Sequence, residues 1–131
     1  MPELPDLVYI EKKLRPIVLD AEIREAKVFE PIVLRMGVTG DFSDVLPGRR
    51  IRDLRRHGPY LVFAIPPLEM IVHFMLAGFF RLDAKETGPI RIRRSNRDHC
   101  FTLALDGPRM LHYFDSRRMG KIYVVKEGAT S

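Results

Sequence analysis

The chain has 131 residues and a mass of 15.2 kDa, a size that suits one domain built around a single core. Hydrophobic residues make up 46% of it and charged residues 30%, a composition that excludes both a disordered chain and a membrane-spanning one. The 22 lysines and arginines outnumber the 17 acidic residues, so the net charge is +5.

An amphipathic helix is the first predicted element. Pro5 suits its first turn, because the N–H that proline lacks would have no partner inside the helix. We expect the helix to end around Pro16 or shortly after it. A second, short helix is predicted at 41–46, with Pro47 and Gly48 ending it. The apolar residues that recur at helical spacing in the first helix are Leu7, Ile10, Leu14 and Ile17.

The remaining predicted elements are short strands, each rich in β-branched or aromatic residues and bounded by Gly, Pro, Asp or Asn. Their hairpin-like spacing predicts an α+β fold that is mostly β. This fold is a two-sheet antiparallel β-sandwich of about eight strands, with the N-terminal helix packed against it. The predicted strands cover residues 22–29, 50–56, 60–65, 70–75, 79–83, 100–105, 110–114 and 121–125.

Two segments are predicted to lie outside regular structure. Residues 83–96, which include Arg91, Arg93 and Arg94, are expected to form an exposed basic loop. Residues 127–131 resemble a linker. No internal boundary divides the chain, so residues 1–131 are interpreted as one domain.

Positive charge is concentrated in the second part of the chain. Residues 1–48 hold six Lys and Arg against nine Asp and Glu, whereas residues 49–131 hold sixteen against eight. Arginine outnumbers lysine by 16 to 6, and its planar guanidinium suits the paired oxygens of a phosphate group. A polyanion is therefore the leading candidate partner. The alternative is that this small basic protein binds nothing anionic.

The single cysteine excludes an internal disulfide and a zinc site built from several cysteines. We expect Cys100 to be buried and structural. His73, His99 and His112 match no metal-binding spacing, so no metal or other cofactor is predicted in this chain. The first residues lack the apolar segment of a secretory signal, and no apolar run approaches the length of a membrane span. A cytoplasmic protein with no membrane partner is expected.

The N-terminus carries a candidate nucleophile. If Met1 is removed, the secondary amine of Pro2 lies at the start of a helix, whose positive end favours the uncharged form of the amine. Such an amine can attack an aldehyde-like carbon to form an iminium. Glu3 is a candidate general acid or base, and Asp6, one turn further on, is a candidate for directing protons or substrate. The alternative is that these residues only start and cap a helix.

Four blocks of sequence, in order along the chain, resemble the formamidopyrimidine-DNA glycosylase and endonuclease VIII family. The corresponding family motifs are Pro-Glu-Leu-Pro-Glu, Arg-Arg-x-Gly-Lys-Tyr-Leu, His-Leu-Gly-Met-Ser-Gly and Asp-Pro-Arg-Arg-Phe-Gly. In this chain the blocks are Pro2-Glu3-Leu4-Pro5-Asp6, Arg55-Arg56-His57-Gly58-Pro59-Tyr60-Leu61, His73-Phe74-Met75-Leu76-Ala77-Gly78 and Asp115-Ser116-Arg117-Arg118-Met119-Gly120.

The resemblance implies a base-excision-repair DNA glycosylase with AP lyase activity, acting as a monomer on double-stranded damaged DNA of the nucleoid. In that family the N-terminal proline attacks C1′ of a flipped nucleotide and removes oxidised bases through an iminium. By similarity the catalytic residues are Pro2, Glu3 and Asp6. The chain would form the N-terminal catalytic-type domain. The family's helix–two-turn–helix and zinc-finger domains are absent from it, so we expect it to be weakly active or inactive alone.

DNA contacts are also implied by similarity. Leu76, Arg117 and Met119 match the three residues with which the family fills the space left by the flipped base. The whole implied DNA-binding set consists of Arg55, Arg56, His73, Leu76, Arg117, Arg118 and Met119.

Departures from the family pattern favour an alternative function. Pro59 stands where the family has a lysine that assists the chemistry, and proline offers neither an ammonium group nor a backbone N–H. Met119 replaces a flat phenylalanine, and Asp6 is one methylene shorter than the usual glutamate. The alternative is a divergent, non-catalytic relative that binds damaged DNA. An RNA- or ribosome-associated β-domain is a weaker alternative, since it explains the arginines but not the N-terminal block.

Overall fold

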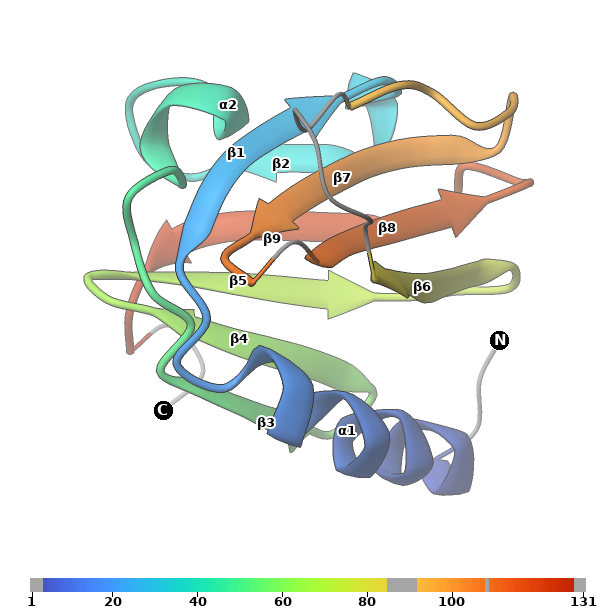
Figure 1. The fold of residues 1–131 in the computed structure, drawn as a ribbon. Coiled ribbons are helices and arrows are strands. Elements are labelled where there is room, and N and C mark those ends of the chain that lie inside the picture. Colours follow the sequence, from blue (N-terminus) through green and yellow to red (C-terminus); the bar gives the residue numbers. More distant parts are fainter. Residues whose placement is uncertain (1–3, 85–91, 108, 129–131) are drawn as a thin grey trace.

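Two β-sheets pack face to face in the computed structural model, which describes residues 4–84, 92–107 and 109–128 (Figure 1). The first sheet has four strands in the order β1-β7-β8-β6, and the second has five in the order β2-β9-β5-β4-β3. The elements in chain order are α1 (Leu4–Val18), β1 (Ile23–Val28), the 3-10 helix η1 (Pro31–Val33), β2 (Leu34–Met36), α2 (Phe42–Val45), β3 (Asp53–His57), β4 (Tyr60–Ile65), β5 (Leu68–His73), β6 (Gly78–Ala84), β7 (His99–Leu105), β8 (Arg109–Asp115) and β9 (Lys121–Lys126).

The hydrophobic core lies between the two sheets, because alternate residues of each strand point toward the opposite sheet. Leu61 and Phe63 of β4 are fully buried in this core. Phe63 meets Phe80 of β6 edge-on, with 5.7 Å between ring centroids, and so joins the second sheet to the first. Within the first sheet, Tyr113 of β8 stacks on Phe101 of β7 at 5.3 Å. Aromatic contacts of this kind fix the spacing of the two layers.

The central strands of the first sheet are buried on both faces. Every residue of β7 is buried, and β8 is buried from its second residue onward. These strands therefore contain nearly continuous apolar sequence instead of an alternating pattern. A further layer of side chains covers the outer face of this sheet, and it includes Phe79, Arg81 and Phe114.

Helix α1 lies along one edge of the sandwich. It buries Leu7, Leu14 and Val18 against the core, and Arg15 pairs with Asp53 of β3 at 2.7 Å. Pro16 lies inside the last turn, so the helix continues slightly beyond it. The predicted end around Pro16 is confirmed. Among the described residues, no helix is long and apolar enough to cross a bilayer.

The predicted two-sheet α+β sandwich is confirmed, and it contains one strand that the sequence does not predict. Strand β2 (Leu34–Met36) has only three residues, too few to show an alternating pattern. It joins the edge of the second sheet parallel to β9, whereas the other paired strands are antiparallel. The described strands therefore number nine.

Two of the predicted strands have boundaries that differ from the observed ones by more than one residue. Strand β3 begins at Asp53, because Arg50 forms only an isolated bridge with Glu22, which precedes β1. Strand β5 begins at Leu68 and ends at His73, two residues earlier than predicted at each end. The chain then leaves the second sheet after His73 and crosses to the first.

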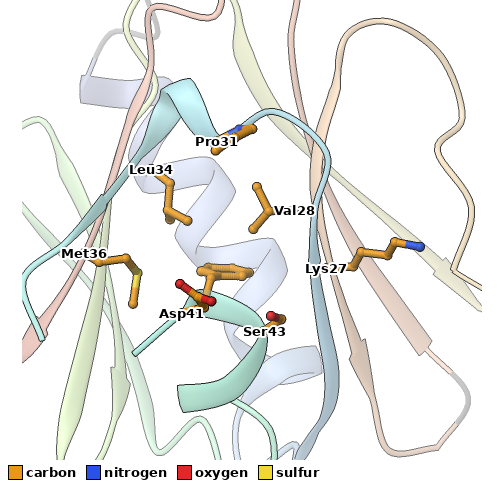
Figure 2. A pocket seen from close by; sticks show the side chains of 8 residues that line it. Lys27, Val28, Pro31, Leu34, Met36, Asp41 and Ser43 are labelled. Carbon is orange, nitrogen blue, oxygen red and sulfur yellow. The ribbon is translucent and has the colours of Figure 1, made fainter. Parts of the chain in front are cut away.

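A pocket of about 440 Å³ opens at the edge formed by β1, β2 and α2 (Figure 2). The buried Phe42 is one of the residues that line it, and Figure 2 shows Lys27 pointing away from it. None of the sequence-predicted site residues is among the residues that line it. The lining residues are Lys27, Val28, Pro31, Leu34, Met36, Asp41, Phe42 and Ser43.

Candidate nucleic-acid interface

Three turns that contain or adjoin sequence-predicted DNA-binding residues lie at one end of the sandwich. Tyr60 starts β4 directly after the β3–β4 turn, and the strand register places it beside His73, the last residue of β5. Lys121 pairs with His73, so β9 starts at the same end. Gly78 pairs with Asp115, so the start of β6 meets the end of β8 there. The β3–β4, β5–β6 and β8–β9 turns are therefore neighbours, as Figure 1 shows.

The N-terminal end of α1 points toward the same end of the molecule. The guanidinium of Arg109, at the start of β8, donates to the carbonyl of Ile17 near the C-terminal end of α1. Strand β8 runs away from that contact, and Figure 1 shows the N-terminal end of α1 on the same side of the molecule as the turn that follows β8. Asp6 belongs to α1, with its side chain outside the described part of the structure. Pro2 and Glu3 lie outside the described residues.

The β8–β9 turn is built around the carboxylate of Asp115, which is fully buried. Its Oδ1 accepts hydrogen bonds from the backbone N–H groups of Arg117 (3.0 Å) and Arg118 (2.9 Å). Its Oδ2 accepts from the N–H of Gly120 at 2.7 Å. Hydrogen bonds to an ionised acceptor are stronger than neutral ones. One side chain therefore fixes the course of the whole turn, including Arg118, whose φ of 52° is unusual for a residue with a side chain.

The β5–β6 and β8–β9 turns meet at the hydroxyl of Tyr113. A Cβ atom on Gly78 would lie 2.2 Å from this oxygen, and one on Gly120 would lie 2.1 Å from it. The hydroxyl approaches Oδ2 of Asp115 at 3.4 Å. Burial, with the adjacent Asp115 charge, raises the pKa of Tyr113, so the phenol stays protonated. Only glycine leaves room for both turns to close on this ring.

Apolar side chains project from the two turns into solvent. Leu76 of the β5–β6 turn is 56% exposed, and Met119 of the β8–β9 turn is 40% exposed. Arg117 is also exposed. The ammonium of Lys121 donates a hydrogen bond to the backbone carbonyl of Met119 at 3.1 Å, and this bond helps to hold the backbone of Met119 in place. The structure thus brings together the three residues that match the family's space-filling set.

Arg118 is placed differently from Arg117. Its guanidinium donates to the carbonyl of Arg97 and lies 3.2 Å from Oε1 of Glu30. Arg94 reaches the same two oxygens, at 2.7 Å and 2.5 Å. The hydrogen bond from Arg94 is the main cause that lowers the pKa of Glu30. One carboxylate therefore pairs with Arg118 of the implied DNA-binding set and with Arg94 of the predicted basic loop. Arg93 of that loop is exposed, and Arg91 lies outside the described residues.

Arg55 also faces a carboxylate of the protein. Its Nη2 lies 3.0 Å from Oε2 of Glu69, a residue of β5 that is only 4% exposed. Arg56, the next residue, is exposed and donates to the carbonyl of Gly58 in the β3–β4 turn at 3.1 Å. A DNA contact by either arginine stays a prediction, and for Arg55 it would compete with the ion pair.

His73 closes β5 beneath the β3–β4 turn. Its ring meets that of Tyr60 edge-on at 5.1 Å. Burial, together with the charge of Lys121, lowers the pKa of His73, which is therefore neutral near pH 7. Pro59 lies exposed in the turn between His57 and Tyr60, so the tip of this hairpin offers no ammonium group.

A buried polar chain under the outer face of the first sheet was not predicted from the sequence. The backbone N–H of Ser95 donates to Nδ1 of His99 at 3.0 Å, so the proton of this ring lies on Nε2. His99 Nε2–H then donates to the Thr102 hydroxyl (2.6 Å), which donates to Nδ1 of His112 (2.7 Å). Nε2–H of His112 completes the chain at the carboxylate of Asp83, 3.2 Å away. The sequence contains these four side chains, but it does not show that they contact one another in this order.

The burial of His99 makes the protein sensitive to acid. Burial is the main cause that lowers the pKa of His99 to about 4. An unfolded histidine has a pKa near 6.5, so between these two values the unfolded state binds a proton that folded His99 does not bind. We expect the free energy of unfolding to fall by about 3 kcal/mol through this residue as the pH decreases from about 7 to 4. Urea unfolding at a series of pH values measures this slope.

Two substitutions of histidine by glutamine, one as the test and one as its matched control, show whether His99 is responsible. His99→Gln should remove the contribution of His99, and a smaller slope should remain because burial also lowers the pKa values of His73 and His112. His57→Gln, at an exposed position of β3, should leave the slope unchanged. An equally steep acid dependence in the His99→Gln chain would show that another group is responsible.

Cys100 is confirmed as a buried residue. Its side chain is fully buried, its thiol donates to the carbonyl of Asp98, and burial raises its pKa to about 11. Such a thiol is a poor nucleophile. Across residues 4–84, 92–107 and 109–128, no group of three or more His, Cys, Asp and Glu side chains is arranged to hold a metal ion.

Comparison with known proteins gives one consistent result. A model of the formamidopyrimidine-DNA glycosylase N-terminal domain matches residues 1–122. The formamidopyrimidine-DNA glycosylase of Thermus thermophilus is 32% identical over 129 residues, which cover 98% of this chain and 42% of that protein. The enzyme of the same name from Acidothermus cellulolyticus is 36% identical over 124 residues, covering 92% and 42%. The chain therefore spans less than half the length of these curated relatives.

Solved structures show the same fold. The crystal structure of MutM (Fpg) from Thermus thermophilus matches with a TM-score of 0.75 at 29% identity, covering 98% of this chain and 42% of that one. Lactococcus lactis Fpg, in a complex with DNA that contains an abasic site, matches with a TM-score of 0.80 at 22% identity, covering 96% and 45%.

Proposed function

The chain belongs to the formamidopyrimidine-DNA glycosylase family, and on this basis we propose that it is the N-terminal domain of a base-excision-repair DNA glycosylase with AP lyase activity. Oxidised bases in double-stranded DNA are the proposed substrates. The relatives are named as DNA glycosylases, and a solved neighbour holds DNA with an abasic site, which supports damaged DNA as the partner.

One observation carries the proposal. The turns that hold Leu76, Arg117 and Met119 meet at one end of the sandwich, and the N-terminal end of α1 is directed toward it. Exposed apolar side chains beside an exposed arginine are suited to enter a DNA duplex and to contact its phosphates. The sequence places Pro2 and Glu3 immediately before α1.

The proposed chemistry begins at the amine of Pro2. Its lone pair attacks C1′ of the damaged nucleotide, and the electrons of the glycosidic bond leave with the base, which takes up a proton. Glu3 protonates the ring oxygen of the sugar, the ring opens and an iminium forms on Pro2. Loss of a proton from C2′ then expels the 3′ phosphate and breaks the strand. Asp6 is proposed to direct protons in these steps.

Pro59 supports the second candidate function, a relative that binds damaged DNA without cleaving it. The hairpin tip has no ammonium group, and the ammonium of Lys121 is hydrogen-bonded to the carbonyl of Met119. This candidate shares the DNA-binding end of the first proposal and lacks only its covalent step. Formation of an adduct on Pro2 distinguishes the two.

Binding to a duplex that contains an abasic site is expected to weaken steeply with salt. The logarithm of the association constant should fall with the logarithm of the salt concentration by about 0.9 for each phosphate that the protein neutralises. Arg117→Ala should weaken binding and reduce this slope by about one phosphate. Fluorescence anisotropy of a labelled duplex at several salt concentrations measures both quantities.

Arg24→Ala is the control for this experiment. It removes the same charge from an exposed position on β1, and it should leave the slope unchanged. A flat salt response of the unsubstituted chain, or equal slopes for the unsubstituted and Arg117→Ala chains, would contradict a phosphate-binding role for this end.

A further inference from the structure

Three aromatic rings form a stack across the outer face of the first sheet. Phe79 of β6 lies on Phe114 of β8, with 5.2 Å between ring centroids and 13° between ring planes. Phe114 in turn stacks on His99 of β7 at 4.7 Å and 21°. Phe79 and Phe114 are directly paired residues of neighbouring strands, so the register of the sheet fixes the stack.

Only the first ring of this stack is open to solvent. Phe114 is 2% exposed and His99 is fully buried, whereas Phe79 is 50% exposed. The guanidinium of Arg81 lies 4.8 Å from the ring centroid of Phe114, and its pair of hydrogen bonds to Asp83 holds it there. Phe79 cannot turn inward, because the space beneath it is filled. Its outer side is therefore a fixed, flat apolar surface.

The position of Phe79 relates this surface to the proposed DNA-binding end. Its neighbour Gly78 packs on the Tyr113 hydroxyl and pairs with Asp115, which organises the turn of Arg117 and Met119. Leu76, the exposed residue of the adjoining turn, precedes it by three positions. An aromatic ring beside a phosphate-binding end matches a nucleobase better than it matches an apolar peptide, because a base offers a flat π-face carried on an anionic backbone.

We propose that Phe79 is a base-stacking residue, whose exposed ring receives a nucleobase that has lost a stacking neighbour at the lesion. This inference rests on the proposed binding of damaged DNA and adds a contact outside the Leu76, Arg117 and Met119 set. Met119 has no flat face, and Phe79 supplies one at the same end of the molecule.

The chain contains no tryptophan, which provides a direct test. Phe79→Trp introduces a single indole, and we expect its fluorescence to be quenched when a duplex with an abasic site is added, more strongly than with the undamaged duplex. Leu19→Trp is the matched control, since Leu19 is 37% exposed and follows the end of α1 that is remote from the turns. Its emission should not change at the same saturation.

Affinity provides the second readout. Phe79→Leu keeps an apolar cover over Phe114 but removes the π-face, and it should weaken binding of the abasic duplex about tenfold. Phe79→Tyr, which keeps the ring, should bind like the unsubstituted chain. Urea unfolding confirms that each variant is folded.

The outcomes separate this inference from the function on which it rests. Unquenched Phe79→Trp emission at saturation, or full affinity in the Phe79→Leu chain, would overturn the stacking role and leave the proposed function standing. If the unsubstituted chain does not prefer the abasic duplex to the undamaged one, the proposed function fails and the stacking role fails with it.

Discussion

Replacing Asp115 by alanine is expected to lower the free energy of unfolding by about 3 kcal/mol, because three backbone N–H groups lose a charged acceptor in a buried turn. The same change should weaken binding of a duplex with an abasic site about tenfold, since Arg117 and Met119 lose their fixed positions. Urea unfolding and fluorescence anisotropy measure the two effects.

Asp115→Asn and Asp44→Ala complete this experiment. The asparagine can still accept the bonds from Arg117 and Arg118, but its amide group would face the N–H of Gly120, so an intermediate loss is expected. Asp44 is exposed on α2, and its removal should change stability by no more than about 0.5 kcal/mol. Equal stability of the Asp115→Ala and Asp44→Ala chains would contradict the organising role of Asp115.

Gly120→Ala is expected to destabilise the protein by a similar amount, about 3 kcal/mol, because the added methyl group would overlap the Tyr113 hydroxyl. The ring of Tyr113 cannot move aside, since it is buried and stacked on Phe101. Removing only the hydroxyl should therefore relieve this overlap, while the contact of the methyl group with Oδ2 of Asp115, at 2.8 Å, remains. We expect the double variant Gly120→Ala, Tyr113→Phe to recover at least half of the loss, as measured by a double-mutant cycle in urea.

A second double-mutant cycle combines Gly78→Ala with Tyr113→Phe, and a different degree of rescue is expected. A methyl group there would also lie 2.8 Å from the backbone carbonyl oxygen of Phe74 and 2.9 Å from Cζ of Tyr113, and Tyr113→Phe leaves both atoms in place. The methyl group of Gly120→Ala would keep one contact of this kind, at 2.8 Å, with the side-chain Oδ2 of Asp115. The rescue of Gly78→Ala should be smaller than that of Gly120→Ala. If Tyr113→Phe rescues neither variant, the meeting of the two turns on this hydroxyl is not the cause of the strain.

The fold could be predicted largely from sequence because its strands are bounded by turn residues and filled with β-branched and aromatic side chains. Strand β4 (Tyr60–Ile65) has the predicted limits. Strand β2 could not be predicted, because three residues do not show a period and its stability comes from pairing with β9, which is distant in the chain. The buried outer face of the first sheet is likewise a tertiary feature, made by contacts such as Phe79 on Phe114.

The candidate site could be predicted as a set of residues, but not as an arrangement. Sequence motifs indicate Leu76, Arg117 and Met119, and the structure brings them together. The motifs treat Arg55 and Arg118 as equivalent to Arg117, whereas the structure pairs them with Glu69 and Glu30. These carboxylates lie on other strands or loops, so no local pattern could show that they hold the arginines.

The exposed aromatic ring at this end of the molecule is at a different position from the phenylalanine of the family motif. The sequence shows that Met119 lacks the flat face of a phenylalanine, but it does not show which other ring lies near it. Exposure of Phe79 depends on the layer beneath it, and this layer includes residues of β7 and β8. The only local sign of an exposed ring in the sequence is the pair Phe79-Phe80, because successive residues of a strand face opposite sides of the sheet.

Trapping the covalent intermediate tests the central claim most directly. The chain without Met1 is incubated with a saturating amount of a duplex that contains an abasic site, in the presence of borohydride, which reduces an iminium to a stable amine. We predict a slowly formed protein–DNA adduct that mass spectrometry assigns to the nitrogen of Pro2, and its loss from that nitrogen in a chain that keeps Met1. No adduct at full occupancy of the duplex, or an adduct on a lysine side chain instead, would contradict the claim that Pro2 is the nucleophile.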